Sequence, residues 1–508
     1  MVLSNIMFKK MMSLAILLLG VLLSACSLFT TYITTAVTTT SNNTTEITDN
    51  LNTTSTEDIV DYSYDNLFDN QIYKKFVIHF SKTNFFKLIS DMETYNDEFG
   101  SYRDNTIQEV DIDYTDSLGN TISMNEVGFR TKGNVFSRVL PVTKDEQGNI
   151  TGYQQVSFQL EFNETFTYLE NSTQYKELKD RRGFDLEQLN FKYIKASDSS
   201  GITEMMAYKL YNEAGVVTSK TSFAIIYFDI EGTLVPYGLF LVQEPIDDVF
   251  VKRYFGRDQD GSVGDLYKCV WQTEPAKLTP DYNEWSLGVS DYEEGYRKTY
   301  QLKTNKETSN FSQFTSFVDK LNNNGVINYQ NVLEQNLDVD SLLRAFAIGF
   351  LIGSPDDYRS DANNYYLYFY ENKAIYIPFD MDQCLGYGWD PLGNHGINLD
   401  VLIYQPSQSN IGSASDLPLS YNILSIEEYR NLYLSYLIEF TNPDNGIFDY
   451  QDFFQEFTKA KNLYESEIRA NNHLGLYTFS TIQRDMNPQD YYTQKASYVR
   501  THAQEYLN

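Results

Sequence analysis

Carboxylate and amide side chains gather in one short stretch of this 508-residue sequence. Asp356 and Asp357 are adjacent in a segment that contains glycine and proline, which is typical of a loop. Asp380 and Asp382 follow an apolar run and stand two residues apart, so on a strand both carboxylates would face the same side. Together with the amide oxygen of Asn364, these are the oxygen ligands that a hard divalent cation such as Mg²⁺ or Mn²⁺ prefers.

Such a group of carboxylates suits phosphoryl transfer. A loop held by a sheet can carry a catalytic base, and metal ions held by carboxylates neutralise charge on the transferred phosphate. The alternative is that these acids are ordinary solvated surface groups, because the chain has 69 aspartates and glutamates in all. The Asp-Asp pair could equally cap a turn or a helix.

The elements that must position these residues predict an α+β protein. Residues 364–369 and 374–377 are expected to form a hairpin with the carboxylates at its edge. Before the hairpin, apolar alternation and helical spacing predict strands at 75–80, 109–114, 126–130, 156–162, 189–191, 224–228 and 239–242, and helices at 84–92 and 203–212. Two helices, at 311–321 and 339–350, are expected shortly before the hairpin. After the hairpin the chain is expected to be mainly helical from 426 to the end. The expected architecture is a β-rich N-terminal half and a helical C-terminal half, with the active-site hairpin between them.

The N-terminus has the pattern of a secretory signal. Lys9 and Lys10 precede the apolar run 11–23, which is short for a membrane span, and small residues follow before Cys26. The tetrad Leu-Ser-Ala-Cys resembles the bacterial lipobox, and that resemblance implies cleavage before Cys26 and lipidation of its thiol. The alternative is an ordinary N-terminal anchor with an incidental cysteine.

The predicted domain organisation has three parts. Residues 1–25 are expected to be a signal peptide and residues 26–65 a lipidated cysteine followed by a flexible tether rich in Thr, Ser and Asn. Residues 66–508 are expected to form the folded domain. The protein is therefore expected on the extracytoplasmic face of a bacterial cell membrane, attached to it through the lipid anchor only.

Composition narrows the possible partners and sites. The formal net charge is −30, which argues against nucleic-acid binding because nothing would offset repulsion from phosphates. Four histidines make a site with clustered histidine ligands improbable, and three cysteines cannot form a disulfide framework. With Cys26 lipidated, Cys269 and Cys384 are left as free thiols or as a pair that the sequence alone does not place.

Several blocks of the sequence, taken in order, resemble the CotH-type spore-coat protein kinases. The blocks that carry the resemblance are 127–134, 189–190, 237–247, 264–268, 356–357, 363–368, 377–382 with Gly386, and 427–430. The resemblance spans roughly residues 75 to 470. It implies an atypical kinase-like fold that binds ATP with Mg²⁺ or Mn²⁺ and transfers the γ-phosphate to a Ser or Thr hydroxyl of a protein substrate.

The resemblance also assigns roles to individual residues. Asp357 would be the catalytic aspartate, Asp380 and Asn364 would ligate the metal, and Asp382 would support them. Asn363 competes with Asn364 for the ligand position, because the two are adjacent and strand phase decides between them. The motifs of eukaryotic kinases and of P-loop proteins are absent from the sequence.

Nucleotide binding is expected to involve Lys132, Glu244 and Lys268. For the two lysines, simple solvation on the surface is the alternative. One departure is notable: the family usually has a lysine where this chain has Gln159, and an amide supplies no charge to a phosphate. A catalytically degenerate surface-binding or structural lipoprotein therefore remains an alternative. A third hypothesis is a carbohydrate-active or carbohydrate-binding lipoprotein with Glu244 and Asp380 as the paired carboxylates.

Overall fold

Seven strands of the first half close into a barrel. The computed structural model describes residues 62–507 except 258–260, 273, 292–294 and 405–410. The strands are β1 (Lys75–Phe80), β2 (Gln108–Thr115), β3 (Thr121–Thr131), β6 (Phe158–Glu161), β7 (Gln188–Tyr193), β8 (Thr221–Ile230) and β9 (Thr233–Gln243). Their order around the barrel is β1-β2-β3-β6-β7-β9-β8. The parallel pairing of β1 with β8, from Lys75↔Ile225 to Phe80↔Ile230, closes the barrel, while the other neighbours are antiparallel.

Aromatic side chains fill the barrel. The strands alternate in burial, as in the pattern of β1, where every second residue is buried. Phe158 stacks on Phe129 and on Phe191, with ring centroids 5.0 and 4.7 Å apart. Packing of this kind links three neighbouring strands through one ring.

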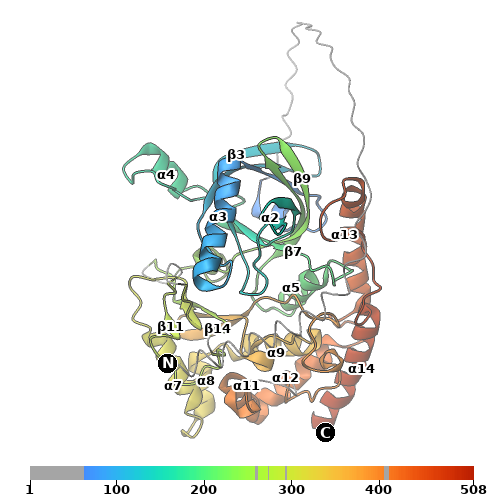
Figure 1. Cartoon of the computed structure of the whole chain (residues 1–508). Coiled ribbons are helices and arrows are strands. Elements are labelled where there is room, and N and C mark those ends of the chain that lie inside the picture. The colour runs from blue at the N-terminus through green and yellow to red at the C-terminus, as the bar shows by residue number, and fades with distance from the viewer. Residues whose placement is uncertain (1–61, 258–260, 273, 292–294, 405–410, 508) are drawn as a thin grey trace, which may run out of the picture. The chain divides into compact units, whose positions relative to one another are not determined.

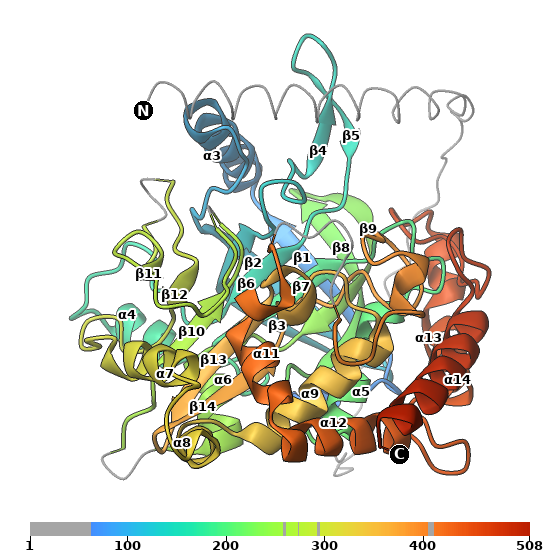
Figure 2. The same cartoon turned by 90° about the horizontal axis from the view of Figure 1, so that it is seen from below.

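Short elements surround the barrel (Figure 1). They are α2 (Tyr64–Phe68), α3 (Lys82–Phe99), β4 (Val142–Lys144), β5 (Ile150–Tyr153), α4 (Thr173–Lys179), α5 (Thr203–Glu213) and α6 (Asp248–Phe255). The Ser81 hydroxyl accepts a hydrogen bond from the backbone of Asn84 and so begins α3. The β4–β5 hairpin projects from the barrel (Figure 2).

A second sheet has five strands in the order β11-β12-β10-β13-β14. They are β10 (Leu266–Cys269), β11 (Leu287–Gly288), β12 (Tyr300–Leu302), β13 (Tyr365–Tyr370) and β14 (Lys373–Pro378). The last two pair as an antiparallel hairpin, from Tyr365↔Pro378 to Tyr370↔Lys373. β10 pairs with β13, so the expected hairpin is part of a larger sheet.

Helices dominate the second half, and in Figure 1 most of them lie below the barrel while α13 runs alongside it. They are α7 (Ser312–Asn322), α8 (Tyr329–Asn336), α9 (Val339–Ile352), α10 (Tyr358–Asp361), α11 (Pro418–Ser425), α12 (Glu427–Phe440), α13 (Tyr450–Ala470) and α14 (Pro488–Leu507), with single 3₁₀ turns at Asn394–Gly396 and Ala414–Asp416. Eleven of the 14 residues of α9 are buried, so this helix is the centre of the helical half. Within the described part of the chain, no helix has both the length and the apolar composition that a membrane crossing requires.

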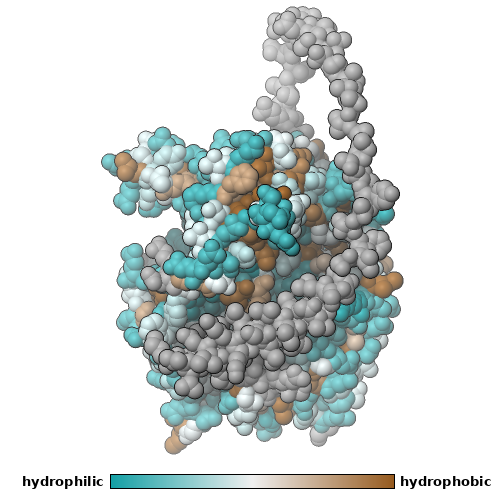
Figure 3. Space-filling model, viewed as in Figure 1, coloured by the Kyte–Doolittle hydropathy of each residue, from teal (hydrophilic) through white to brown (hydrophobic). Residues whose placement is uncertain are grey.

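The face shown in Figure 3 is largely hydrophilic, and hydrophobic residues reach it mainly over the barrel. Water-exposed polar groups on this face accord with the large negative net charge of −30.

The structure confirms the α+β class and most of the expected elements. Closure of the barrel and the three strands that extend the hairpin into a sheet were not expected. The predicted signal peptide and nearly all of the tether lie outside the described residues. The boundary expected at residue 65 falls inside α2, because the Tyr62 ring already packs on Phe184 at 4.4 Å and Ser63 caps the helix.

Candidate functional site

The β13–β14 hairpin brings Asn364 and Asp380 together. Asn364 precedes β13 and Asp380 follows β14, and the Phe379 amide donates to the Asn364 carbonyl oxygen at 3.1 Å. Both residues have left-handed backbone conformations, with φ of 54° for Asn364 and 62° for Asp380. Asparagine and aspartate tolerate this conformation better than other non-glycine residues, so both strands can turn sharply at this point.

Asp356 faces the same group. Its Oδ1 accepts from the Asn363 amide at 2.8 Å, and its Oδ2 accepts from the Asn364 amide at 2.9 Å. Burial raises the pKa of Asp356 to about 7, and repulsion from Asp380 and Asp382 adds to the increase. Asp356 is thus an electrostatic neighbour of both aspartates that follow β14.

Asp357 points elsewhere. Its Oδ1 accepts hydrogen bonds from the backbone nitrogen and the hydroxyl of Ser360, each at 3.0 Å, which caps α10. Its Oδ2 lies against α9, since a methyl group added to Gly349 would approach it to 2.8 Å. The expected grouping of Asp357 with Asn364 and Asp380 is therefore not what the structure shows.

The reason for this difference is local backbone geometry. Asp357 has extended angles, φ −96° and ψ −173°, and successive side chains of an extended segment point to opposite sides. Of the two adjacent carboxylates, one therefore faces the hairpin and the other faces the interior. The serine three residues after Asp357 is the sequence signal of a helix cap, which favours a structural role for this carboxylate.

Lys192 of β7 lies among three carboxylates. Its Nζ is 2.7 Å from Glu204 Oε1 and 3.3 Å from Asp382 Oδ2, and it also contacts Asp380 Oδ1. Lys195 reaches Asp382 Oδ2 at 2.9 Å. These ion pairs attach the barrel to the aspartates that follow β14.

The lysines change the acidity of their partners. Burial alone would raise the pKa of Asp380, but the charges of Lys192, Lys268 and Lys195 and the hydrogen bond from Lys192 together outweigh burial and hold that pKa below its ordinary value. Burial raises the pKa of Glu204 to about 7 in spite of its contact with Lys192. Sequence reasoning missed Lys192, Lys195 and Glu204, because only the pairing of the barrel strands reveals which lysine faces the hairpin.

Gln159 belongs to a row of polar side chains across three barrel strands. Arg130, Gln159 and Asn190 are register partners on β3, β6 and β7. The Gln159 amide donates to Asn190 Oδ1 at 2.9 Å and accepts from Arg130, which also pairs with Glu161 at 2.6 Å. Both ends of the Gln159 amide are therefore engaged inside the barrel wall.

Lys132 and Lys268 lie near this row. The Lys132 Nζ donates to Asn190 Oδ1 at 2.7 Å, and burial lowers the pKa of Lys132 well below its usual range, with repulsion from Arg130 and Lys268 adding to the effect. The Lys268 Nζ is 4.5 Å from the centre of the Phe379 ring, and its charge also lowers the pKa of Asp380. Lys268 therefore acts electrostatically on both the barrel row and the hairpin aspartates.

Glu244 belongs to a different set of contacts. Its side chain is buried and accepts from the Tyr64 hydroxyl at 2.8 Å, from Arg253 at 2.7 Å and from the Tyr254 hydroxyl at 3.2 Å. Burial raises its pKa. Among the described residues no hydrogen bond or ion pair joins Glu244 to Asp380, and the partners of Glu244 are Tyr64, Arg253 and Tyr254.

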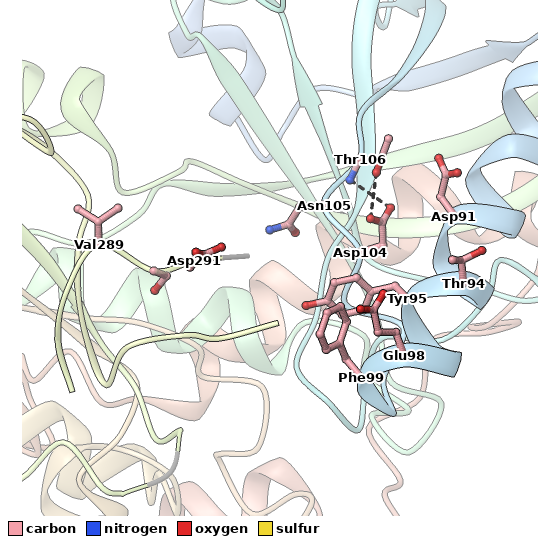
Figure 4. A pocket seen from close by; sticks show the side chains of 11 residues that line it. Asp91, Thr94, Tyr95, Glu98, Phe99, Asp104, Asn105, Thr106, Val289 and Asp291 are labelled. Atoms are coloured by element: carbon pink, nitrogen blue, oxygen red, sulfur yellow. Dashed lines mark hydrogen bonds between the residues drawn. The ribbon is translucent and has the colours of Figure 1, made fainter. Parts of the chain in front are cut away.

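A pocket of about 830 Å³ lies apart from these residues (Figure 4). Its wall is formed by α3, by the segment 104–106 and by residues 289–291, and it carries the acids Asp91, Glu98, Asp104 and Asp291. None of the residues expected to bind metal or nucleotide lines this pocket.

The donor set of the hairpin suits a metal that is bound together with phosphates. Among the described residues no three acidic, histidine or cysteine side chains are arranged as a complete metal cage. Mg²⁺ is usually held by one or two carboxylates plus the phosphates of its substrate, and Asp380 and Asp382 are such a pair. Asp380 Oδ2 and the Asn364 side-chain oxygen accept no hydrogen bond from the described residues, so both oxygens are available to coordinate a metal ion.

The cysteines divide into two groups. Cys269 and Cys384 are free and buried, so they form no disulfide with each other. Cys26, the expected lipidation site, lies outside the described residues.

Comparison with known proteins gives one result for most of the chain. The model of a family described as CotH kinase protein matches residues 130–504. No curated protein matches the chain. The matched residues include the barrel strands from β6 to β9, the five-stranded sheet and the carboxylates at the hairpin.

Proposed function

The chain belongs to the CotH kinase family, and on this basis we propose that it transfers the γ-phosphate of ATP to a Ser or Thr hydroxyl of a protein substrate. The observation that carries the proposal is the meeting of Asp356, Asn364, Asp380 and Asp382 at one end of the β13–β14 hairpin, with lysines of the barrel facing them. Acids and cations at close range are what a triphosphate with its metal requires.

Asp356 is proposed as the catalytic carboxylate. Its carboxylate contacts Asn364 and lies near the two aspartates proposed to hold the metal, which is where a base for the acceptor hydroxyl must stand. In the transfer, the acceptor hydroxyl gives its proton to Asp356 while its oxygen bonds to the γ-phosphorus. The bond from that phosphorus to the bridging oxygen breaks, and ADP leaves with the electron pair.

Asp357 is proposed to position Asp356 for this step. The cap that it forms with Ser360 fixes the segment on which Asp356 stands, and α9 packs against its other oxygen. We assign the catalytic role to Asp356, whose carboxylate contacts Asn364. We assign a positioning role to Asp357, whose carboxylate caps α10 and lies against α9.

Asp380, Asp382 and Asn364 would hold the metal, Mg²⁺ or Mn²⁺. Bound there, the metal supplies positive charge that stabilises the transferred phosphate. Asn363 donates to Asp356 and to no phosphate-facing group, and its oxygen accepts from the Trp271 amide, so Asn364 is the better candidate of the two.

The three residues expected to bind the nucleotide are proposed to act in different ways, Lys268 directly and Lys132 and Glu244 indirectly. Lys268 is near enough to act on Asp380, which favours a direct contact with phosphate. Lys132 and Glu244 are proposed to shape the site through the barrel row and through α6 respectively, because each is already hydrogen-bonded to its neighbours.

Location follows from the N-terminal pattern. We propose that Cys26 is lipidated and holds the protein on the extracytoplasmic face of a bacterial cell membrane, with ATP and a protein substrate as its partners. The sequence Leu-Ser-Ala-Cys and the short apolar run before it support this proposal.

Radiolabel transfer tests the catalytic proposal. The parent chain is incubated with γ-labelled ATP, Mn²⁺ and a mixture of secreted proteins, beside variants Asp356→Asn, Asp380→Asn and Asp361→Asn. Loss of the base or of the metal ligand is expected to reduce labelling by at least about 100-fold. Asp361→Asn is the matched control, because burial also raises the pKa of Asp361 to about 7 but the residue takes no part in the proposed step.

Equal labelling by the parent and by Asp356→Asn would overturn the proposed role of Asp356. If Asp357→Asn lost the label while Asp356→Asn kept it, the catalytic carboxylate would be Asp357 after all. All variants are first compared by thermal unfolding, so that a misfolded variant is recognised.

Gln159 favours a second candidate function. In this case the protein keeps the fold of the family and binds ATP but does not transfer its phosphate. The amide is 2% exposed and adds no positive charge to the barrel row. Calorimetry with ATP and Mg²⁺ shows whether the protein binds nucleotide at all. Transfer of the γ-labelled phosphate then distinguishes an active kinase from a protein that only binds ATP.

A further inference from the structure

Lys192 reaches the hairpin carboxylates from the barrel wall. It stands two residues after Asn190 on β7, so the two side chains emerge on the same face of the strand. Asn190 accepts hydrogen bonds from Lys132 and Gln159. Lys192 forms ion pairs with the carboxylates of Glu204, Asp380 and Asp382. The positive charge nearest to the proposed metal ligands among these barrel side chains is therefore at position 192.

Glu204 gives Lys192 a partner that does not belong to the metal site. Two of the three carboxylates around Lys192 are proposed metal ligands, but Glu204 stands on α5 and its oxygen lies 2.7 Å from the Lys192 Nζ. Lys195, by contrast, pairs only with Asp382 in the described contacts. An ion pair between a strand lysine and a helix glutamate is the arrangement by which protein kinases hold a phosphate-binding lysine.

Three other polar side chains near the site, Lys132, Gln159 and Lys268, are already engaged with neighbouring groups. Lys132 donates to Asn190 and is repelled by the charges of Arg130 and Lys268. Gln159 has no charge, and both ends of its amide are used. Lys268 packs over the Phe379 ring. Lys192 alone of these four combines a charge, a helix partner and contact with the hairpin aspartates.

We propose that Lys192, held by Glu204, contacts the phosphates of ATP and supplies the charge that Gln159 does not. This inference rests on the proposed function and names one of its binding residues. An ammonium has three N–H donors, so one can remain on Glu204 while the others meet phosphate oxygens.

The first test measures ATP affinity by calorimetry in the presence of Mg²⁺, for the parent, Lys192→Ala and Lys209→Ala. Loss of a charged hydrogen bond to phosphate is expected to weaken ATP binding roughly 10- to 100-fold in Lys192→Ala. Lys209 is the matched control, because it too lies among carboxylates, with Asp452 and Glu213 as partners, and its side chain is 24% exposed against 20% for Lys192. Lys209→Ala should bind ATP as the parent does.

A second variant, Glu204→Gln, keeps the shape of the partner and removes its charge. It is expected to weaken ATP binding less than Lys192→Ala does, because the lysine remains and only its anchor changes. If the parent binds ATP and both Lys192→Ala and Glu204→Gln bind it equally well, the inference is wrong while the proposed function stands. If the parent itself binds no ATP, the proposed function falls and takes the inference with it.

Chemical labelling tests the same point in the unsubstituted protein and so does not depend on a variant that folds. An acyl-phosphate derivative of ATP carries a reactive carbonyl at its terminal phosphate. A lysine amine next to the phosphates attacks that carbonyl, an amide forms, and ATP leaves. Mass spectrometry is expected to find ATP-protectable acylation on Lys192. Protectable acylation of Lys132 or Lys268 with Lys192 unmodified would overturn the assignment.

Discussion

A single histidine ties together three barrel strands at the point of closure. His79 on β1 places Nδ1 3.0 Å from Asp229 Oδ2 on β8 and Nε2 3.0 Å from Asp113 Oδ2 on β2. Partial burial lowers the pKa of His79, but hydrogen bonds and attraction to both aspartates outweigh burial and raise it. The protonated ring therefore bridges the closing strand to both of its neighbours.

This bridge predicts a pH-dependent contribution to stability. Because the pKa of His79 is raised in the folded state, its stabilisation is fully present below the unfolded pKa of about 6.5 and is lost as pH rises through the higher folded pKa. His79→Gln is expected to lower the free energy of unfolding by about 1 kcal/mol or less at pH 5.5, since the ring is partly exposed, and by much less at pH 9.

Denaturant unfolding at the two pH values checks this expectation, with His473→Gln as a comparison for which the opposite pH trend is expected. His473 is buried, and burial lowers its pKa to about 4, so it is neutral at both pH values. In the unfolded chain, however, this imidazole has its ordinary pKa of about 6.5 and is largely protonated at pH 5.5, so His473→Gln should cost about 1 kcal/mol less at pH 5.5 than at pH 9. A loss in His79→Gln that does not change with pH would show that the bridge is not ionic.

Some of the site could be predicted from residues and some could not. Asn364 and Asp380 meet because hairpin pairing brings the ends of its two strands together, and that pairing is visible as two apolar runs with a short turn between them. The direction of the Asp356 and Asp357 side chains depends on backbone angles that a sequence does not state. Lys192 faces the aspartates only because strands far apart in the chain pair in a particular register.

At the scale of elements, the second sheet depends on one position without a side chain. Gly264 precedes β10, and a methyl group built on it would lie 1.6 Å from the Phe369 carbonyl oxygen of β13. Close approach at this point lets Phe369 donate to the Asp265 carbonyl oxygen at 3.0 Å and aligns β10, which carries Lys268, with the strand that follows Asn364.

Gly264→Ala is therefore expected to destabilise the protein by about 2 to 4 kcal/mol, because β10 and β13 must separate to admit the methyl group. Urea unfolding measures the change. Gly325→Ala is the control, since a methyl group there meets nothing within 4 Å, and it should change stability by no more than about 0.5 kcal/mol. A Gly264→Ala variant as stable as the parent would show that the two strands have room to spare.

Element prediction succeeded where the pattern is local. Alternating apolar residues predicted β2 and β6, and apolar spacing predicted α5, α7 and α9 within a few residues of their observed bounds. Short helices such as α4 and α6 were missed, because five to eight residues carry too little periodicity. Barrel closure was also missed, since the parallel pairing of β1 with β8 leaves no signal in either strand alone.

At the scale of the whole molecule, the N-terminal cysteine predicts attachment to a membrane. When the full chain is produced in a bacterium, labelled palmitate is expected to be incorporated and the protein to sediment with membranes. Cys26→Ser should abolish both, because the thiol is the proposed acceptor. Cys384→Ser, which alters a buried thiol of the folded part, should keep the label. Retention of label by Cys26→Ser would place the lipid on another residue.

Closure of the barrel can be completed only late in the synthesis of its strands. His79 and Asp229 are 150 residues apart, and the strands that carry them must meet before the ring is complete. A growing polypeptide therefore exposes one unpaired side of β1 to its surroundings until β8 has left the ribosome, and long-range parallel pairing of this kind is slow. That interval is when a chaperone or an export factor would find the chain open.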